Sequence, residues 1–193
     1  MSILNDFCSV IRRRSKENQD AMNALLSVGL PLSPAFSILR QELDSMVRVI
    51  FLLNNENLEE RDIYINDLMK GKKWHFRTEN GKFRPIQDRD MVEISTGFQG
   101  WVNYVYRFGC AFIHLSNLHY YENDVFSSGL SDDDIADIEH YLYQYHGYNV
   151  NEELSLQSIR PYIPNVLDKI SSNLEFYLDK LESGLVLDVA DKT

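Results

Sequence analysis

The chain has little cysteine, and this excludes several kinds of site. Its two cysteines, Cys8 and Cys110, are too few for a disulfide framework, and neither belongs to a closely spaced pair typical of zinc sites. The sequence also lacks a glycine-rich phosphate loop, a nucleophile elbow and a histidine spacing suited to a metal ion. We therefore expect two structural thiols, no metal ion and no cofactor.

The chain also has fewer basic than acidic residues. The 193 residues include 19 Lys and Arg against 29 Asp and Glu, which gives a formal net charge of -10. This balance disfavours bulk non-specific binding of nucleic acid and favours solubility. The basic cluster of the first segment, Arg12 to Arg14, follows the apolar positions, unlike a secretory signal peptide. Length and composition predict one domain, residues 1–184, in a soluble cytoplasmic protein with a flexible tail at 185–193.

Hydrophobic periodicity predicts a mainly α-helical fold. Ser33 with Pro34, and Ser131 with Asp134, are typical of helix starts, whereas Gly147 is typical of a helix end. Together the periodicity and the end signals predict six helices, at about residues 3–28, 33–54, 58–70, 95–121, 131–147 and 164–184. The fold class is therefore a helical bundle.

One segment between the third and fourth helices departs from the helical pattern. The sequence KWHFRTE, then Asn80-Gly81, then KFRPI, predicts a β-hairpin insertion at about 73–87 with a two-residue type I′ turn. Its basic residues alternate with aromatic ones, a combination that can bind the phosphates and bases of RNA. The candidate RNA-binding residues are Lys72, Lys73, Trp74, Arg77, Lys82 and Arg84. Alternatively, the rings pack on the bundle and the charges are only solvated.

The fourth predicted helix is the most unusual element, because its only formal charge is Arg107. Two adjacent rows of apolar residues predict that it lies in the middle of a bundle. Its polar residues would be costly in lipid, so we do not expect a membrane span. Asn103, Arg107 and His114 share a third row, and a buried arginine needs an anionic partner. In a purely structural interpretation that partner is Glu42 or Asp44 of the second helix.

An arginine followed by six residues and a histidine, in the context YVYRFGCAFIHLS, resembles the motif of the HEPN superfamily of nuclease-like helical domains. The earlier segment LRQELDSMVRVIFLL is also similar to bacterial members. The resemblance implies a HEPN-like up-and-down bundle in which two copies of the motif meet across a dimer and cleave RNA without a metal. It implies that Arg107 binds phosphate, His114 acts as acid or base, and Asn103 orients one of them. Active members commonly have a polar residue after the arginine, where this chain has Phe108, and some toxin members have a tyrosine where it has Ser116.

The chemistry of these side chains is compatible with that activity. A histidine that titrates near neutrality can move a proton to or from the reacting oxygens, and a guanidinium can stabilise charge on the phosphate. A symmetric dimer would supply two histidines. Close approach of two such helices would be allowed by the small residues Gly100, Gly109, Cys110 and Ala111.

The leading hypothesis from the sequence is a metal-independent endoribonuclease of the toxin or phage-defence kind. It would act as a homodimer on RNA and would have a cognate antitoxin as a partner. A first alternative is a non-catalytic helical module that dimerises or binds RNA or a protein. A second alternative, which the same resemblance allows, is a substrate-positioning domain for a separate nucleotidyltransferase.

Overall fold

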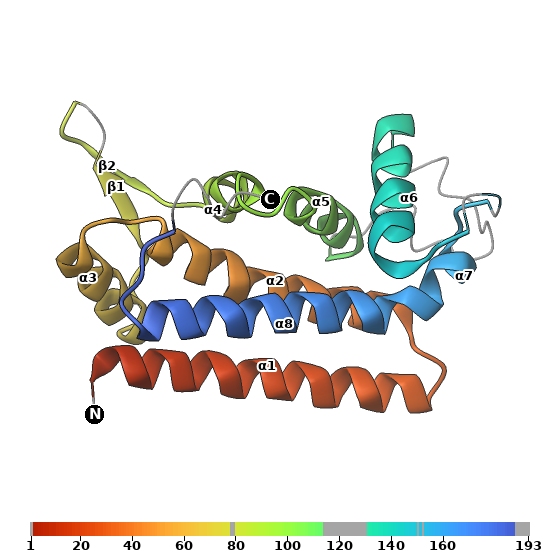
Figure 1. Ribbon diagram of the computed structural model, residues 1–193, viewed down its shortest axis with the longest axis horizontal. Helices are drawn as coiled ribbons and strands as arrows, with labels where there is room; N and C mark the ends of the chain where they lie inside the picture. Colours follow the sequence, from red (N-terminus) through yellow and green to blue (C-terminus); the bar gives the residue numbers. More distant parts are fainter. Residues whose placement is uncertain (1, 78–79, 114–130, 150, 152, 188–193) are drawn as a thin grey trace.

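Three long helices lie side by side and form the body of the protein (Figure 1). They are α1 (Ile3–Ser27), α2 (Leu32–Leu53) and α8 (Ile163–Glu182). The computed structural model describes residues 2–77, 80–113, 131–149, 151 and 153–187. The predicted fold class, a mainly helical bundle with one β-hairpin, is confirmed for these residues. In this described part, none of the helices combines the length and the apolar character needed to cross a membrane.

The helix at the centre of the bundle is α2. It packs against α1 and α8, and on its other side against α4 (Asp88–Thr96) and α5 (Val102–Ile113). Residues on nearly every side of α2 are buried, as expected for a helix enclosed by others. The prediction that the 95–121 segment is the central helix is therefore wrong, because α5 covers α2 from outside.

The predicted helix at 95–121 is also interrupted. α4 ends at Thr96, and α5 begins only at Val102. Between them, the buried Trp101 donates from Nε1 to Gln99 Oε1 at 2.7 Å, and Gln99 donates from Nε2 to the Tyr177 hydroxyl at 3.0 Å. These side-chain contacts hold a turn where the periodicity alone predicts continuous helix. Residues 114–121 of the prediction lie outside the described part.

The hairpin is present, but its register differs from the prediction. β1 (His75–Arg77) pairs antiparallel with β2 (Phe83–Pro85), and Arg77 lies opposite Phe83. A two-residue turn at Asn80-Gly81 would have placed Arg77 opposite Arg84, and like charges in that position are unfavourable. The observed register instead pairs Phe76 with Arg84, whose guanidinium lies 5.1 Å from the ring centroid. The predicted strand register is therefore wrong by one residue, and the predicted two-residue turn is wrong with it.

The remaining elements lie around this body. α3 (Leu58–Met69) agrees with the helix predicted at about 58–70, has Asn57 as its N-cap and precedes the hairpin. α6 (Asp132–His146) begins at the predicted capping box and stands across the direction of the long helices (Figure 1). The sequence analysis did not predict α4, of which only residues 95 and 96 fall in a predicted helix. It also did not predict α7 (Leu156–Ile159) and the 3-10 turn η3 (Arg160–Tyr162), which lead into α8.

The chain after α8 is held against the end of α2. Leu187 is buried, and its N–H donates to the carbonyl of Leu53 at 3.0 Å. The buried Arg61 donates to the carbonyls of Leu53 and Leu185 at 3.1 and 2.7 Å. The first residues of the predicted tail are thus bound to the bundle, and residues 188–193 lie outside the described part.

Candidate functional site

Arg107 lies on the outer side of α5 rather than in the core. Half of its side chain is exposed, and its Nη2 lies 2.6 Å from Asp134 Oδ1 at the start of α6. The expected burial of Arg107, and its expected pairing with Glu42 or Asp44, are therefore wrong. The apolar rows of α5 face α2 and α6, and this leaves the arginine at the margin where solvent reaches it.

The two carboxylate oxygens of Asp134 have different partners, and only one of them contacts the arginine. Oδ2 accepts hydrogen bonds from the hydroxyl and the backbone N–H of Ser131 and so closes the capping box of α6. Oδ1 is left to contact Arg107. Because this carboxylate is held by the start of α6, the contact keeps Nη2 of Arg107 beside that helix, while half of the arginine side chain stays exposed.

A surface hollow brings Arg107 together with Asn103. Tyr106 also lines this hollow from α5, and α4 contributes further side chains that include Arg89 and Glu93. Two of the three predicted catalytic residues are thus placed beside each other, with a second arginine nearby. The third, His114, lies outside the described part of the chain, as does Ser116.

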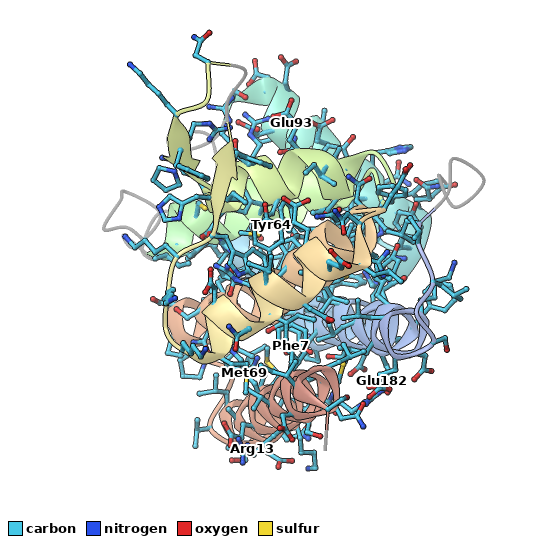
Figure 2. The ribbon with its side chains drawn as sticks, turned by 90° about the vertical axis from the view of Figure 1, so that its left-hand side faces the viewer. Phe7, Arg13, Tyr64, Met69, Glu93 and Glu182 are labelled. Atoms are coloured by element: carbon cyan, nitrogen blue, oxygen red, sulfur yellow. The ribbon has the colours of Figure 1, made fainter. Side chains whose placement is uncertain are left out.

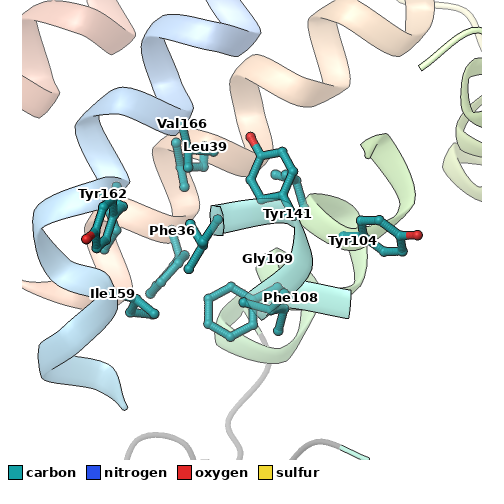
Figure 3. A pocket seen from close by; sticks show the side chains of 13 residues that line it. Phe36, Leu39, Tyr104, Phe108, Gly109, Tyr141, Ile159, Tyr162 and Val166 are labelled. Carbon is teal, nitrogen blue, oxygen red and sulfur yellow. The ribbon is translucent and has the colours of Figure 1, made fainter. Parts of the chain in front are cut away.

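Phe108 points away from this hollow and into the bundle. Its ring contacts Phe36 edge-on at 4.8 Å between centroids, and it helps to line an apolar pocket (Figure 3). All the residues that line this pocket are aliphatic or aromatic or are Gly109, so it offers no charged group for catalysis. Phe108 is a core residue and does not obstruct access to Arg107.

The predicted RNA-binding residues of the hairpin divide into two groups, and Trp74 is in the core. Only 4% of Trp74 is exposed; its Nε1 donates to the Tyr64 carbonyl at 2.7 Å, and its ring stacks on Phe51 at 5.3 Å. Phe76 packs on the same cluster. The interpretation that the rings pack on the bundle therefore holds for these two residues, and Trp74 has no free face for a base. Phe83, by contrast, is 72% exposed.

The basic residues of the hairpin region lie at the surface wherever their side chains are described. Lys73 and Lys82 are exposed, and Arg77 belongs to β1. Lys72 pairs with Asp67 at 3.2 Å. Arg84 makes a two-point contact with Asp90 at 2.8 and 3.0 Å, and this guanidinium lowers the pKa of the Asp90 carboxyl.

Of the small residues in and before α5, Gly109 serves the packing of the subunit itself. Gly109 is buried against α2, where an added Cβ would lie 3.6 Å from the side chain of Arg40. This glycine is therefore not available for close approach of a second α5. Gly100 is exposed, and Cys110 is half-buried in a second hollow.

That second hollow contains a group of charged residues that the sequence analysis missed. It is lined by Arg40, Asp44 and Arg48 of α2, together with Arg14 and Asp88. The four-residue spacing of Arg40, Asp44 and Arg48 along α2 is visible in the sequence, but such spacing alone indicates no more than a local ion pair. The contributions of α1 and α4 come from distant parts of the chain, and no local pattern predicts them.

Comparison with known proteins finds no match to this chain, whether among family models, curated proteins or solved structures. Within the described residues, no three His, Cys, Asp or Glu side chains are grouped as a metal site requires. The geometry of the two hollows is therefore the basis for assigning a function.

Proposed function

We propose that this protein is a metal-independent endoribonuclease of the HEPN type, in a toxin or phage-defence role, and that it acts as a dimer. In this proposal Arg107 binds the scissile phosphate, His114 transfers a proton, and Asn103 orients one of them. The main support is the guanidinium of Arg107, which is half exposed, contacts Asp134 and lines the same hollow as Asn103.

The proposed reaction needs no group beyond those of the chain and its substrate. A base removes the proton of the RNA 2′-hydroxyl, which attacks the adjacent phosphorus, and an acid protonates the 5′-oxygen that leaves. The products are a 2′,3′-cyclic phosphate and a free 5′-hydroxyl. Charge builds on the phosphate oxygens during this step, and the planar fork of Arg107 suits their stabilisation.

The contact with Asp134 leaves Arg107 able to bind a second anion. A guanidinium has five N–H donors, and Asp134 engages Arg107 through Nη2 at the exposed side of α5. Arg89 lines the same hollow and adds a second cation for the phosphate. One histidine in the motif supplies one proton-transfer group, so a dimer would supply the acid and the base together.

The test is cleavage of total RNA by the purified protein in EDTA. We expect the wild type to cleave, and we expect His114→Ala and Arg107→Ala each to lower the rate by at least about a hundredfold. The matched controls are His140→Ala and Arg13→Ala, which remove an exposed histidine and an exposed arginine. Figure 2 shows Arg13 on α1, at the opposite end of the molecule from Glu93 of the hollow. Loss of activity in the control variants as well would contradict the assignment.

A second candidate function is a module that binds RNA or a protein without cleaving it. It is favoured by the ion pair between Arg107 and Asp134, which also serves to tie α5 to α6. A folded wild-type dimer that binds RNA but leaves it intact, with either residue present or replaced, would support this second function over the first.

A further inference from the structure

Five charged side chains of alternating sign run across the second hollow, and we call them the arginine chain: Arg14, Asp44, Arg48, Asp88 and Arg40. Arg14 Nη1 lies 3.3 Å from Asp44 Oδ2, and Arg48 Nη2 lies 3.0 Å from Asp44 Oδ1. The same Arg48 atom lies 3.2 Å from Asp88 Oδ1, and Arg40 Nη2 lies 2.9 Å from Asp88 Oδ2. The arginine chain thus joins α1, α2 and α4 and begins and ends with a cation.

The arginine chain has an excess of positive charge that is partly buried. Three guanidinium groups face two carboxylates, so its formal charge is +1 in a protein whose net charge is -10. Only 10% of the Arg40 side chain and 24% of the Arg48 side chain are exposed. Each arginine has a carboxylate partner, so the excess is one positive charge shared by the group, and an anion bound in the hollow would balance it where the low exposure strengthens the attraction.

The arginines are held in place before any ligand arrives. Arg40 extends over the ring of Tyr106 at 4.4 Å and passes Gly109 on the facing helix. Asp44 and Asp88 each contact two arginines and so fix their guanidinium groups. Such prior ordering lowers the entropic cost of binding, and guanidinium forks match phosphate oxygens in geometry.

The second hollow adjoins the hollow of Arg107 and Asn103. Tyr106 lines both, and this places the arginine chain next to the candidate cleavage site along the surface of α4 and α5. An RNA strand has a phosphate at every nucleotide, so a strand with one phosphate at Arg107 would have others close by.

We propose that the arginine chain binds a phosphate group. In the ribonuclease this would be a phosphate of the RNA strand next to the scissile one, and this part rests on the proposed function. The same chemistry would accept a free nucleotide or inorganic phosphate, so the test separates these sources.

The test uses Arg14→Gln and Arg48→Gln, with Arg13→Gln as the matched control. Arg13 is the exposed neighbour of Arg14 on α1, and its replacement changes the net charge by the same amount. Binding of a fluorescent single-stranded RNA with 2′-O-methyl groups is measured by anisotropy in EDTA at several salt concentrations. Because this RNA has no 2′-hydroxyl to attack, binding is read even if the protein is not a nuclease. Circular dichroism checks that each variant is folded.

We expect each hollow variant to bind the RNA about tenfold more weakly than the wild type, and Arg13→Gln to bind within about twofold of it. The slope of log affinity against log salt should fall by about 0.7 per lost phosphate contact. If RNA binding is unchanged but calorimetry detects inorganic phosphate binding that needs Arg14 and Arg48, the site stands and its ligand is a free phosphate. If neither ligand depends on these arginines, the proposal is wrong and the arginine chain only ties helices together.

Discussion

Glu42 is the most deeply buried carboxyl group that the structure describes, and its replacement gives a sharp test of the core. The residue has 0% exposure at the centre of α2. Its Oε1 accepts hydrogen bonds from the hydroxyls of Ser15, in α1, and Ser171, in α8, and its Oε2 accepts from Asn18 Nδ2 at 2.8 Å. One side chain thus joins the three long helices of the bundle.

Replacing Glu42 by alanine removes the acceptor for three donors at once. An unsatisfied buried donor costs about 1–3 kcal/mol, although a serine hydroxyl in a helix can turn to the carbonyl one turn earlier. The side-chain amide of Asn18 has no such alternative acceptor, and both Asn18 and Ser15 are buried. We therefore expect Glu42→Ala to lower the free energy of unfolding by about 3 kcal/mol, a large part of the 5–15 kcal/mol typical of a domain.

Glu42→Gln separates the loss of hydrogen bonds from the loss of volume. The amide oxygen can accept from the two hydroxyls, and Asn18 can turn its own oxygen toward the new amide group. We expect this variant to lose less than about 1.5 kcal/mol. Urea unfolding followed by circular dichroism measures both variants, with the exposed Glu17→Ala as a control. A Glu42→Ala protein within about 0.5 kcal/mol of the wild type would refute the reasoning.

Three further predictions concern other buried groups. Arg61→Met should cost about 2–4 kcal/mol in urea unfolding, because three carbonyl groups lose the guanidinium that they share. Burial, and then the nearby Lys169, lower the pKa of His146 from its ordinary value of 6.5. The unfolded chain then binds the proton more tightly, so unfolding free energy should fall as the pH drops below that value, and His146→Gln should flatten this dependence. Burial raises the pKa of the Cys8 thiol to about 12, so a thiol reagent should modify only the half-buried Cys110 in the native protein and both cysteines after unfolding.

Local signals predicted several helix ends, because the groups that satisfy a helix end are close in sequence. The predicted start at Ser33 with Pro34 is wrong, since α2 begins at Leu32 with Pro31 as its N-cap and no side-chain hydrogen bond there. Asn57 accepts from the backbone N–H groups of Glu59 and Glu60, and Gly147 takes the left-handed conformation that ends α6. The turn between α4 and α5 was missed because Trp101 continues the apolar spacing of α5, although Gly97 and Gly100 are local signals of a helix break. Its conformation depends on contacts such as that of Gln99 with Tyr177, 78 residues later.

The site was harder to predict than the fold, because side-chain environment depends on distant elements. The apolar neighbours of Arg107 suggested a buried charge, but its partner, Asp134, is on α6 and holds it at the surface. In the hairpin, alternation of basic and aromatic residues cannot tell which side of a strand faces the bundle. Trp74 is buried while the adjacent Lys73 and His75 are exposed, so the aromatic residue most suited to stacking on a base is the one withdrawn from solvent.

The arginine chain also changes what the net charge of -10 implies. At physiological ionic strength charges are screened over about 8 Å, so acids on distant faces have little effect on an anion held in direct contact with a guanidinium. They do repel an approaching polyanion at low salt, where screening extends further. Added salt therefore weakens the contacts in the two hollows while it also relieves the long-range repulsion. We expect the salt dependence of RNA binding to be shallower than the number of arginine contacts alone would give, and it should steepen when acidic residues remote from the hollows are neutralised by mutation.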